Sequence, residues 1–480
     1  MDSVYRMDDP SSARQAAFRL ASTCLALLVA FVAGHFCLRW LMLHTGLVLG
    51  AVRPGVKVYR IVPLYVYWHP HFKTGVLIAL VVLASFFWWA WRFCLRPTPA
   101  RHIVPVLMIW HLAIAIAVAL IDGGPKKLWE PYHIHHRSDY IGAVERIDSP
   151  RQFLHDYARL MPELPLHCRH HPPGGPLFLW WIARLFAAGP VAASWATLLA
   201  ASLTVPAVYL WSREVLDEAP ARLAACLFVL APNVVCYTAT CMDAVFMTPL
   251  VWSFYLLWKA RGSYPLVFGL AAGLAASLAA LMTFSISFVA LWAVVLLAIT
   301  GLADRPRRAN TLLAFSMAVL TAAVFYFVLY AWSGYNLFEV LDAAFQGQAG
   351  VMKGRGHSSL RQSAFFALTN LVAFLFCAGL PLTVLWFQQL TRELRSTTAS
   401  RSRWLTLSFA LALLLVDLAP LYTLETERIW IFMVPMLAIG ASSRLSSYVQ
   451  EARPSPLAQA TLLLLAGQTV IIEMLLDMVW

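Results

Sequence analysis

The sequence predicts an all-α polytopic membrane protein. Of its 480 residues, 60% are hydrophobic and only 12% are charged, which is about half the roughly 25% of charged residues in soluble domains. The mean hydropathy is +0.69, and apolar stretches of about 17 to 25 residues, long enough for a membrane-spanning helix, recur along the chain. These observations exclude an ordinary water-soluble enzyme.

The predicted spans are bounded by Gly, Pro and clustered charges. About thirteen stretches are long enough to cross a hydrocarbon core of about 30 Å. They fall near residues 18–38, 75–95, 102–121, 190–212, 221–241, 243–259, 265–281, 283–300, 310–332, 363–388, 404–422, 429–445 and 457–478. One further apolar run, 176–186, is too short to span comfortably, so we expect it to lie at the outer interface of the membrane.

Basic residues predict the orientation of these spans. Lys and Arg total 36 against 24 Asp and Glu, a net charge of +12. If the N-terminus is cytoplasmic, every short basic loop falls on the cytoplasmic side, as the positive-inside rule requires. These loops hold Arg92, Arg96, Arg101, Lys259, Arg261, Arg305, Arg307, Arg308, Arg392, Arg395, Arg401, Arg403, Arg444 and Arg453. No nucleic-acid-binding motif accompanies them, and no nucleic-acid partner is expected.

This orientation divides the chain into alternating membrane and outer-face parts. They are N-terminal transmembrane helices (1–121), an outer-face loop with interfacial helices (122–189), central transmembrane helices (190–332), a second outer-face loop (333–362) and C-terminal transmembrane helices (363–480). A long polar loop with helical patterns of its own usually carries function. The first outer-face loop is therefore where we expect the chemistry.

Asp139 is the first candidate site residue in this loop. Ser138 or Asp139 lies where the N-cap of a short helix is expected, because Ile141, Val144 and Ile147 follow at helical spacing. Asp139 would then sit at a helix N-terminus that faces the membrane surface. It could equally serve only as a cap, and the sequence leaves both roles open.

A rigid polar elbow follows at residues 167–176. Three histidines and Arg169 precede Pro172 and Pro173, which restrict the backbone, and two glycines then permit a sharp turn. The histidines lack the helical pairs and carboxylates of a zinc motif, so no metal ligand is assigned. Contacts with phosphate or sugar hydroxyls, or a plain surface role, remain the alternatives.

Cations above the C-terminal spans are candidates for binding an anionic head group. Lys353, Arg355 and Arg361 belong to a Gly-rich segment, and Arg428 lies in a turn of a few residues between two spans. A lipid-linked phosphate needs such charges over an apolar groove. Arg428 is held most tightly by its short turn, whereas the others could simply anchor helix ends at lipid head groups.

On these residues the chain resembles the GT-C membrane glycosyltransferases, in particular the branch of protein O-mannosyltransferases and lipid A aminoarabinose transferases. That branch has a catalytic Asp in a short helix of the first large outer loop, followed by an H/K-P-P-like elbow and an interfacial helix. Asp139 with Tyr140 matches the first position, and 171–174 (His-Pro-Pro-Gly) matches the second. Asp243, after Cys241, resembles the family's outer turn and could also be a helix cap.

The chain also departs from this family. Two extra spans, roughly 18–95, precede the helix that leads into the loop, and a single acidic residue occupies the motif where some relatives have two. Paired carboxylates are what a divalent cation prefers. A divalent metal is accordingly possible but not required, and no cofactor is assigned.

The resemblance implies an inverting transfer of a sugar from a polyprenyl-phosphate-linked donor to an acceptor hydroxyl. The acceptor would be a lipid, a glycan or a protein, and the reaction would take place at the outer face of a bacterial inner, or plasma, membrane. Asp139 would be the base, and the donor phosphate would contact Arg428, Lys353, Arg355 and Arg361. The acceptor or sugar pocket would contain Tyr140, His170, His171, Asp243, Glu425 and Glu427.

Two other functions compete with this one. A transporter or flippase of a lipid-linked or anionic solute would use the same spans and basic residues without a base. Such proteins commonly show a repeat and broken helices at mid-membrane depth, and the sequence predicts neither. A metal hydrolase would depend only on the number of histidines. The concentration of polar residues in one loop favours the transferase.

Overall fold

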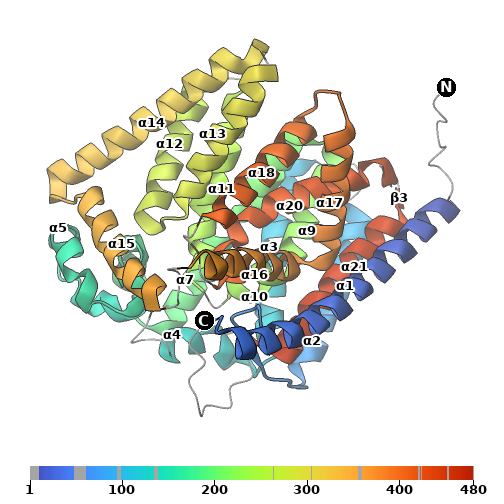
Figure 1. Ribbon diagram of the computed structural model, residues 1–480, viewed down its shortest axis with the longest axis horizontal. Coiled ribbons are helices and arrows are strands. Elements are labelled where there is room, and N and C mark those ends of the chain that lie inside the picture. Colours follow the sequence, from blue (N-terminus) through green and yellow to red (C-terminus); the bar gives the residue numbers. More distant parts are fainter. Residues whose placement is uncertain are drawn as a thin grey trace.

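The computed structural model describes residues 10–47, 61–94, 99–134, 139–239, 241–262, 264–303, 305–354, 359–419, 422, 424–450 and 453–478, most of which are helical. Figure 1 shows long helices packed against one another, with shorter helices gathered at one side. Among the described residues, eight helical segments are long and apolar enough to cross a membrane, or nine if the bent pair α9 and α10 counts as one. The all-α polytopic membrane fold is thus confirmed.

The N-terminal part contains three of these spans. Its elements are α1 (Pro10–Thr45), β1 (Tyr67–Trp68), α2 (Gly75–Trp89) with one π-helical turn (Ala90–Cys94), and α3 (Ala100–Ala119). Helix α1 packs along α21 (Pro456–Leu475), at the other end of the chain (Figure 1). The strand β1 pairs antiparallel with β4 (Leu476–Asp477). The predicted all-α fold therefore includes a short strand pair that joins the segment between α1 and α2 to the segment after α21.

The first outer segment is built from short helices. They are η2 (Pro125–Leu128), α4 (Glu130–Ile134), η3 (Tyr140–Arg146), α5 (Pro150–Leu160), η4 (Met161–Glu163), η5 (Leu166–Arg169) and α6 (Gly174–Leu185), where η denotes a 3-10 helix. Apolar side chains of these helices form a core with Met242, Val245 and Phe246. Through this core, the outer segment packs against the N-terminal end of α11 (Asp243–Ala260).

The central part runs from α7 to α14. Its helices are α7 (Pro190–Ser202), α8 (Thr204–Val215), α9 (Glu218–Leu230), α10 (Pro232–Thr238), α11 (Asp243–Ala260), α12 (Pro265–Met282), α13 (Ile286–Ala303) and α14 (Arg305–Ser333). A Cβ on Gly273 of α12 would lie 2.5 Å from the carbonyl oxygen of Ala318 in α14, so the two backbones approach closely. Such small-residue packing is typical of helices in membranes. The outward apolar side chains of α14, among them Val319 and Phe327, are exposed.

The C-terminal part completes the helical bundle. Its elements are α15 (Leu337–Gly354), α16 (Leu360–Ala378), α17 (Leu380–Arg395), α18 (Arg401–Leu418), α19 (Thr426–Ile429), η6 (Ile431–Met433), α20 (Val434–Leu445), η7 (Ser446–Tyr448), β2 (Val449–Gln450), β3 (Arg453–Pro454) and α21. The strands β2 and β3 pair as a small hairpin.

The count of about thirteen spans is not confirmed. The predicted span 363–388 is two helices, because Gly379 adopts φ +116° between α16 and α17, a conformation that interrupts a helix. The span expected at 429–445 begins as the short turns α19 and η6 before α20. The segment 333–362, predicted as a loop, contains the helix α15. The predicted spans thus differ from the observed helices at places where a helix is broken or short.

Candidate active site

Asp139 occupies the N-cap of the short helix η3, as predicted. Its backbone is extended, with φ −102° and ψ 169°, and its Oδ1 accepts a hydrogen bond of 2.7 Å from the backbone N of Tyr140. The Nδ1 of His167 lies 3.5 Å from the same oxygen. The residue is only 5% exposed. A carboxylate is thus held in one orientation at the start of a helix, where backbone N–H groups favour negative charge.

The elbow brings His171 against this helix. Its ring lies 5.7 Å from that of Tyr140 in an edge-on arrangement and 5.9 Å from that of Phe246 in α11. The hydroxyl of Tyr157 is within hydrogen-bond distance of the carbonyls of Cys168 and His171, at 3.0 and 2.9 Å, and so holds the backbone of the elbow in place. A second polar side chain thereby joins Asp139 and Tyr140.

The glycines of the elbow are required by close contacts. A Cβ on Gly175 would lie 2.7 Å from the Tyr140 ring, and one on Gly174 would lie 2.5 Å from the carbonyl oxygen of Leu281. Real Cβ atoms do not approach other atoms so closely, since the resulting overlap costs more than packing returns. The two glycines therefore allow α6 to start directly against Tyr140 and the end of α12.

Burial controls the protonation of these side chains. It lowers the pKa of His171 to about 3, because a buried imidazole is charged only at a high desolvation cost. The His171 ring is therefore neutral at pH 7. Burial, together with the negative charges of Asp243 and Asp139, raises the pKa of Tyr140 well above its usual value. Its phenol stays protonated.

Arg428 enters the site from the turn α19. Its Nη1 donates to Oδ2 of Asp243 at 2.7 Å, and its Nη2 donates to Oε2 of Glu425 at 2.5 Å. Cys241 lies between them, with its Sγ 2.9 Å from Asp243 Oδ2 and 3.3 Å from Arg428 Nη1. Asp243 is the first residue of α11, where a carboxylate is stabilised by the helix dipole. The guanidinium is therefore positioned by two carboxylates.

These groups form one cluster around Tyr140 and His171. The phenol of Tyr140 interacts electrostatically with Asp139, Asp243 and Arg428, and the ring of His171 interacts with Asp243 and Arg428. The structure accordingly brings together six of the predicted site residues, which are Asp139, Tyr140, His171, Asp243, Glu425 and Arg428. Their roles in a reaction remain predictions.

Glu427 has hydrogen-bond partners different from those of Arg428. Its Oε1 accepts a hydrogen bond of 2.6 Å from the backbone N of Tyr65, and its carbonyl accepts one of 3.0 Å from the side-chain amide of Asn233. Burial raises the pKa of Glu427 to about 7. The residue thus fastens the turn to the segment 61–66 and to α10. The contact with Tyr65 has no signal in the sequence.

The described contacts of the cluster do not include the side chain of Arg361, and they include His170 only through its electrostatic interaction with His171. Arg361 is exposed in the first turn of α16. Lys353 belongs to α15, but its side chain lies outside the described residues, as does the whole of Arg355. His170 is partly buried beside α15, where a Cβ on Gly347 would lie 3.2 Å from its ring. Their part in phosphate or sugar binding stays a prediction.

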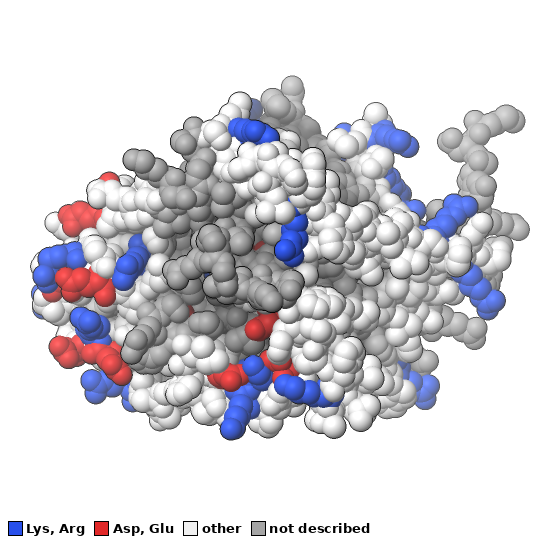
Figure 2. Space-filling view, turned by 60° about the horizontal axis from the view of Figure 1, so that its bottom comes forward, with Lys and Arg blue, Asp and Glu red and all other residues white. Residues whose placement is uncertain are grey.

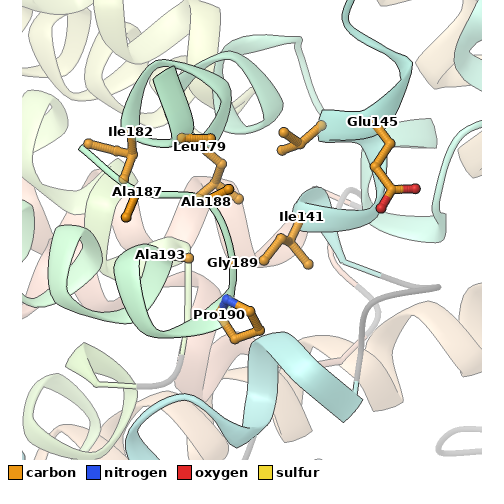
Figure 3. A pocket seen from close by; sticks show the side chains of 11 residues that line it. Ile141, Glu145, Leu179, Ile182, Ala187, Ala188, Gly189, Pro190 and Ala193 are labelled. Carbon is orange, nitrogen blue, oxygen red and sulfur yellow. The ribbon is translucent and has the colours of Figure 1, made fainter. Parts of the chain in front are cut away.

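An apolar pocket of about 380 Å³ adjoins η3. Figure 3 shows it between η3, α6 and the start of α7, with Ile141, Leu179 and Ile182 among its lining residues and Glu145 at one side. Ile141 follows Asp139 by two residues. The pocket therefore offers an apolar surface on the same helix that carries the carboxylate.

Charged side chains on the surface gather mainly near the edges of the face seen in Figure 2. A group of both signs lies at the left, where Figure 1 places α5. On this helix Arg159, which is exposed, forms an ion pair with Asp156 at 3.1 Å. Mixed charges of this kind are typical of a surface in contact with water.

Residues 170–332 match the model of a family described as dolichyl-phosphate-mannose-protein mannosyltransferase. Over this segment, which is less than half of the chain, the sequence is similar to that family of membrane glycosyltransferases. The match includes residues 170–176 of the elbow, α6 and Asp243, and it confirms the predicted resemblance. No curated protein matches the chain.

Three solved structures show a partly similar course of the chain. ArnT from Cupriavidus metallidurans, bound to undecaprenyl phosphate, has a TM-score of 0.45 and 12% identity, covering 70% of this chain and 60% of ArnT. Its apo state has the same score and identity, with 59% of ArnT covered. The Archaeoglobus fulgidus oligosaccharyltransferase, in complex with Zn and sulfate, has a TM-score of 0.46 and 16% identity, covering 76% of this chain and 52% of that enzyme. The chain thus spans 60% or less of each, and these similarities support no argument about its chemistry.

Proposed function

We propose that the protein transfers a sugar from a polyprenyl-phosphate carrier to an acceptor hydroxyl, with inversion at the anomeric carbon. The main support is that Asp139 and the Arg428–Asp243 pair both interact with Tyr140, and that the same pair also interacts with His171. Such a transfer needs a base for the acceptor proton and positive charge for the departing phosphate. A carboxylate and a guanidinium supply both.

Asp139 is the proposed base. The acceptor oxygen attacks the anomeric carbon, and its proton passes to the Asp139 carboxylate. The bond from the anomeric carbon to the phosphate oxygen breaks, and its electron pair leaves with the polyprenyl phosphate. The hydrogen bond from the Tyr140 amide holds the carboxylate in place, and such positioning is a large part of catalysis in reactions of this type.

Arg428 is the proposed ligand of the leaving phosphate. A guanidinium has five N–H donors, so its bonds to Asp243 and Glu425 are compatible with a further bond to phosphate oxygen. Lys353, Arg355 and Arg361 are proposed as additional phosphate ligands around the same donor. The negative partners hold Arg428 still, and a preorganised cation stabilises developing charge without reorganisation.

The substrates are expected to occupy both the polar cluster and the apolar pocket. Tyr140, His170, His171, Asp243, Glu425 and Glu427 are proposed to bind sugar or acceptor hydroxyls. The pocket beside η3 suits an apolar portion of the acceptor or of the carrier lipid. The reaction is proposed for the outer face of a bacterial inner membrane, with a lipid, glycan or protein as acceptor.

Replacement of the base tests this proposal. Asp139→Asn keeps the helix cap, because Asn and Asp cap equally well, and it should lower sugar transfer by about 10²- to 10⁴-fold in the purified protein. Mass spectrometry of the lipid that co-purifies with the protein would identify the carrier, and the donor for the assay would be built on that carrier. Asp148→Asn, at an exposed position of the same segment, is the matched control.

Two results would contradict the proposal. Full transfer by folded Asp139→Asn protein would remove Asp139 from the role of base. Counterflow of a labelled lipid-linked solute in vesicles, without any covalent product, would instead indicate a transporter.

A further inference from the structure

Two histidines outside the proposed active site lie on one extended segment. His69 and His71 follow β1, and their backbone N–H groups donate to the carbonyls of Leu475 and Met474, at 3.0 and 2.9 Å. The pairing with the end of α21 therefore anchors the backbone that carries both imidazoles, whose ring centroids lie 5.5 Å apart.

The end of α3 brings a carboxylate to these histidines. Gly75 makes this approach possible, because a Cβ there would lie 2.1 Å from the carbonyl oxygen of Leu120. Asp122 and His71 are 4% and 7% exposed, whereas His69 is exposed. One ligand atom from each of the three residues lies within 4.8 Å of the others.

The hydrogen bonds of His71 and Asp122 leave one ligand atom of each side chain available for a metal ion. The Nδ1 of His71 donates to the carbonyl of His69 at 2.7 Å, so its Nε2 faces Asp122. That Nε2 lies 3.4 Å from Asp122 Oδ1, and neither atom has a hydrogen-bond partner among the described residues. A carbonyl that fixes the second ring nitrogen is the usual support of a metal-bound histidine.

The distance itself favours two ligands of one ion. A charge-assisted hydrogen bond between imidazolium and carboxylate would be about 2.7 to 2.9 Å long. Two ligands on a tetrahedral zinc ion, each about 2.0 to 2.1 Å from the metal, are separated by about 3.3 Å. The observed 3.4 Å agrees with the second arrangement.

We propose that His69, His71 and Asp122 bind a divalent transition metal ion of the zinc class. Two imidazoles and a carboxylate form a donor set that suits zinc, with a fourth position open to water.

The surrounding charges are compatible with this ion. Lys127 pairs with the other oxygen of Asp122, Oδ2, at 2.7 Å and with Glu130 at 2.7 Å, and Lys73 donates to the Asp122 carbonyl. The buried Glu473 also interacts electrostatically with Asp122. Asp122 therefore keeps Oδ1 for the metal while Lys127 orients its second oxygen.

The site has a structural consequence for the first outer segment. Asp122 is where that segment leaves α3, and the histidines are attached to the C-terminal end of α21. A bound ion therefore ties three distant parts of the chain together at the base of the segment that carries Asp139. This proposal is independent of the proposed transferase activity.

Zinc binding by the purified full-length protein tests the site. After treatment with a chelator and titration with Zn²⁺, the protein should bind one ion per chain, measured by equilibrium dialysis and mass spectrometry of the metal. His69→Ala, at an exposed position, should weaken this binding at least about 100-fold, more than the usual loss of an outer-shell partner. His69→Cys should restore binding because thiolate is also a zinc ligand.

Control measurements separate the site from adventitious binding. His102→Ala removes another exposed histidine and should leave zinc affinity unchanged, and Zn²⁺ should raise the unfolding temperature of the wild type but not of His69→Ala. Absence of stoichiometric binding in the wild type, or equal binding by wild type and His69→Ala, would overturn the proposal. His71 and Asp122 would then form a simple ion pair.

Discussion

At the scale of single residues, the buried charges explain how the cluster keeps its geometry. Arg428 and Asp243 are 185 positions apart in sequence and 7% and 8% exposed. Removal of one member of a buried pair typically costs about 3 to 5 kcal/mol, because it leaves an uncompensated charge. Substitutions that keep the charge are therefore the informative ones at this site.

Arg428→Lys should lower kcat/KM by about 10²- to 10³-fold, the usual cost of removing a preorganised donor. Lysine keeps the charge but cannot reproduce the planar fork that contacts Asp243 and Glu425 together. Steady-state transfer assays with varied donor would measure the loss. Arg184→Lys, at an exposed position, is the matched control, and unchanged kinetics of Arg428→Lys would contradict phosphate binding by Arg428.

His171 should make the folded protein less stable in acid. Its pKa is about 3 in the folded chain against an ordinary value of 6.5, so between these values the unfolded chain takes up a proton that the folded chain does not. Stability from this residue is complete above pH 6.5 and falls as the pH decreases. The difference in unfolding temperature between wild type and His171→Gln should shrink from pH 7.5 to pH 5.

Unfolding in detergent at these two pH values measures that difference. His133→Gln, at an exposed position, should show no such change. A constant difference between wild type and His171→Gln would mean that the His171 ring titrates normally.

At the scale of elements, the site depends on how closely short helices meet. Helix α6 starts directly against the ring of Tyr140, and η3 starts at Asp139. The separation of these two helices decides where the carboxylate and the elbow lie. A displacement of about 1 Å can cost about 10²-fold in rate.

Gly175→Ala should therefore reduce transfer by about 10-fold or more through displacement of Tyr140. Its new Cβ would lie 2.7 Å from the Tyr140 ring, whereas a Cβ on Gly467 in α21 would meet no atom within 4 Å. Gly467→Ala is thus the matched control and should keep full activity. Equal activity of both variants would show that Tyr140 tolerates displacement.

Some of these elements could be predicted from the sequence and others could not. Hydropathy located the long spans, and local spacing placed Asp139 at a helix cap, since both depend on neighbouring residues. The sequence did not predict the break at Gly379, because a single residue causes it. It also did not predict the helix α15, because only one face of this helix is partly buried. The contact of Glu427 with Tyr65 and the gathering of His69 with Asp122 depend on residues far apart in sequence, which no local pattern reveals.

At the scale of the whole molecule, the arrangement requires a defined orientation in the membrane. The exposed apolar side chains of α1 and α14, such as Val29 and Phe327, suit contact with lipid. The segment with Asp139 and the basic segment between α17 and α18 are predicted on opposite sides by the distribution of Arg and Lys. Labelling can test this directly.

Single cysteines should report the two sides in a background without the native cysteines. Asp148→Cys, in the outer segment, should react with an impermeant maleimide in intact cells, whereas Thr398→Cys, between α17 and α18, should react only after permeabilisation. Both positions are exposed. Reaction of both before permeabilisation, or the reverse pattern, would place the carboxylate on the wrong side for an outer-face transferase.

The pairing of Arg428 with Asp243 also bears on biosynthesis. The segment 170–332, which carries the family match, contains Asp243 but neither Asp139 nor Arg428. A ribosome that has made only the first 400 residues has delivered the carboxylates at 139 and 243 without the guanidinium that neutralises the second. The nascent protein therefore holds an unbalanced charge until its last helices are inserted, and premature termination there leaves a chain without the cation that its cluster requires.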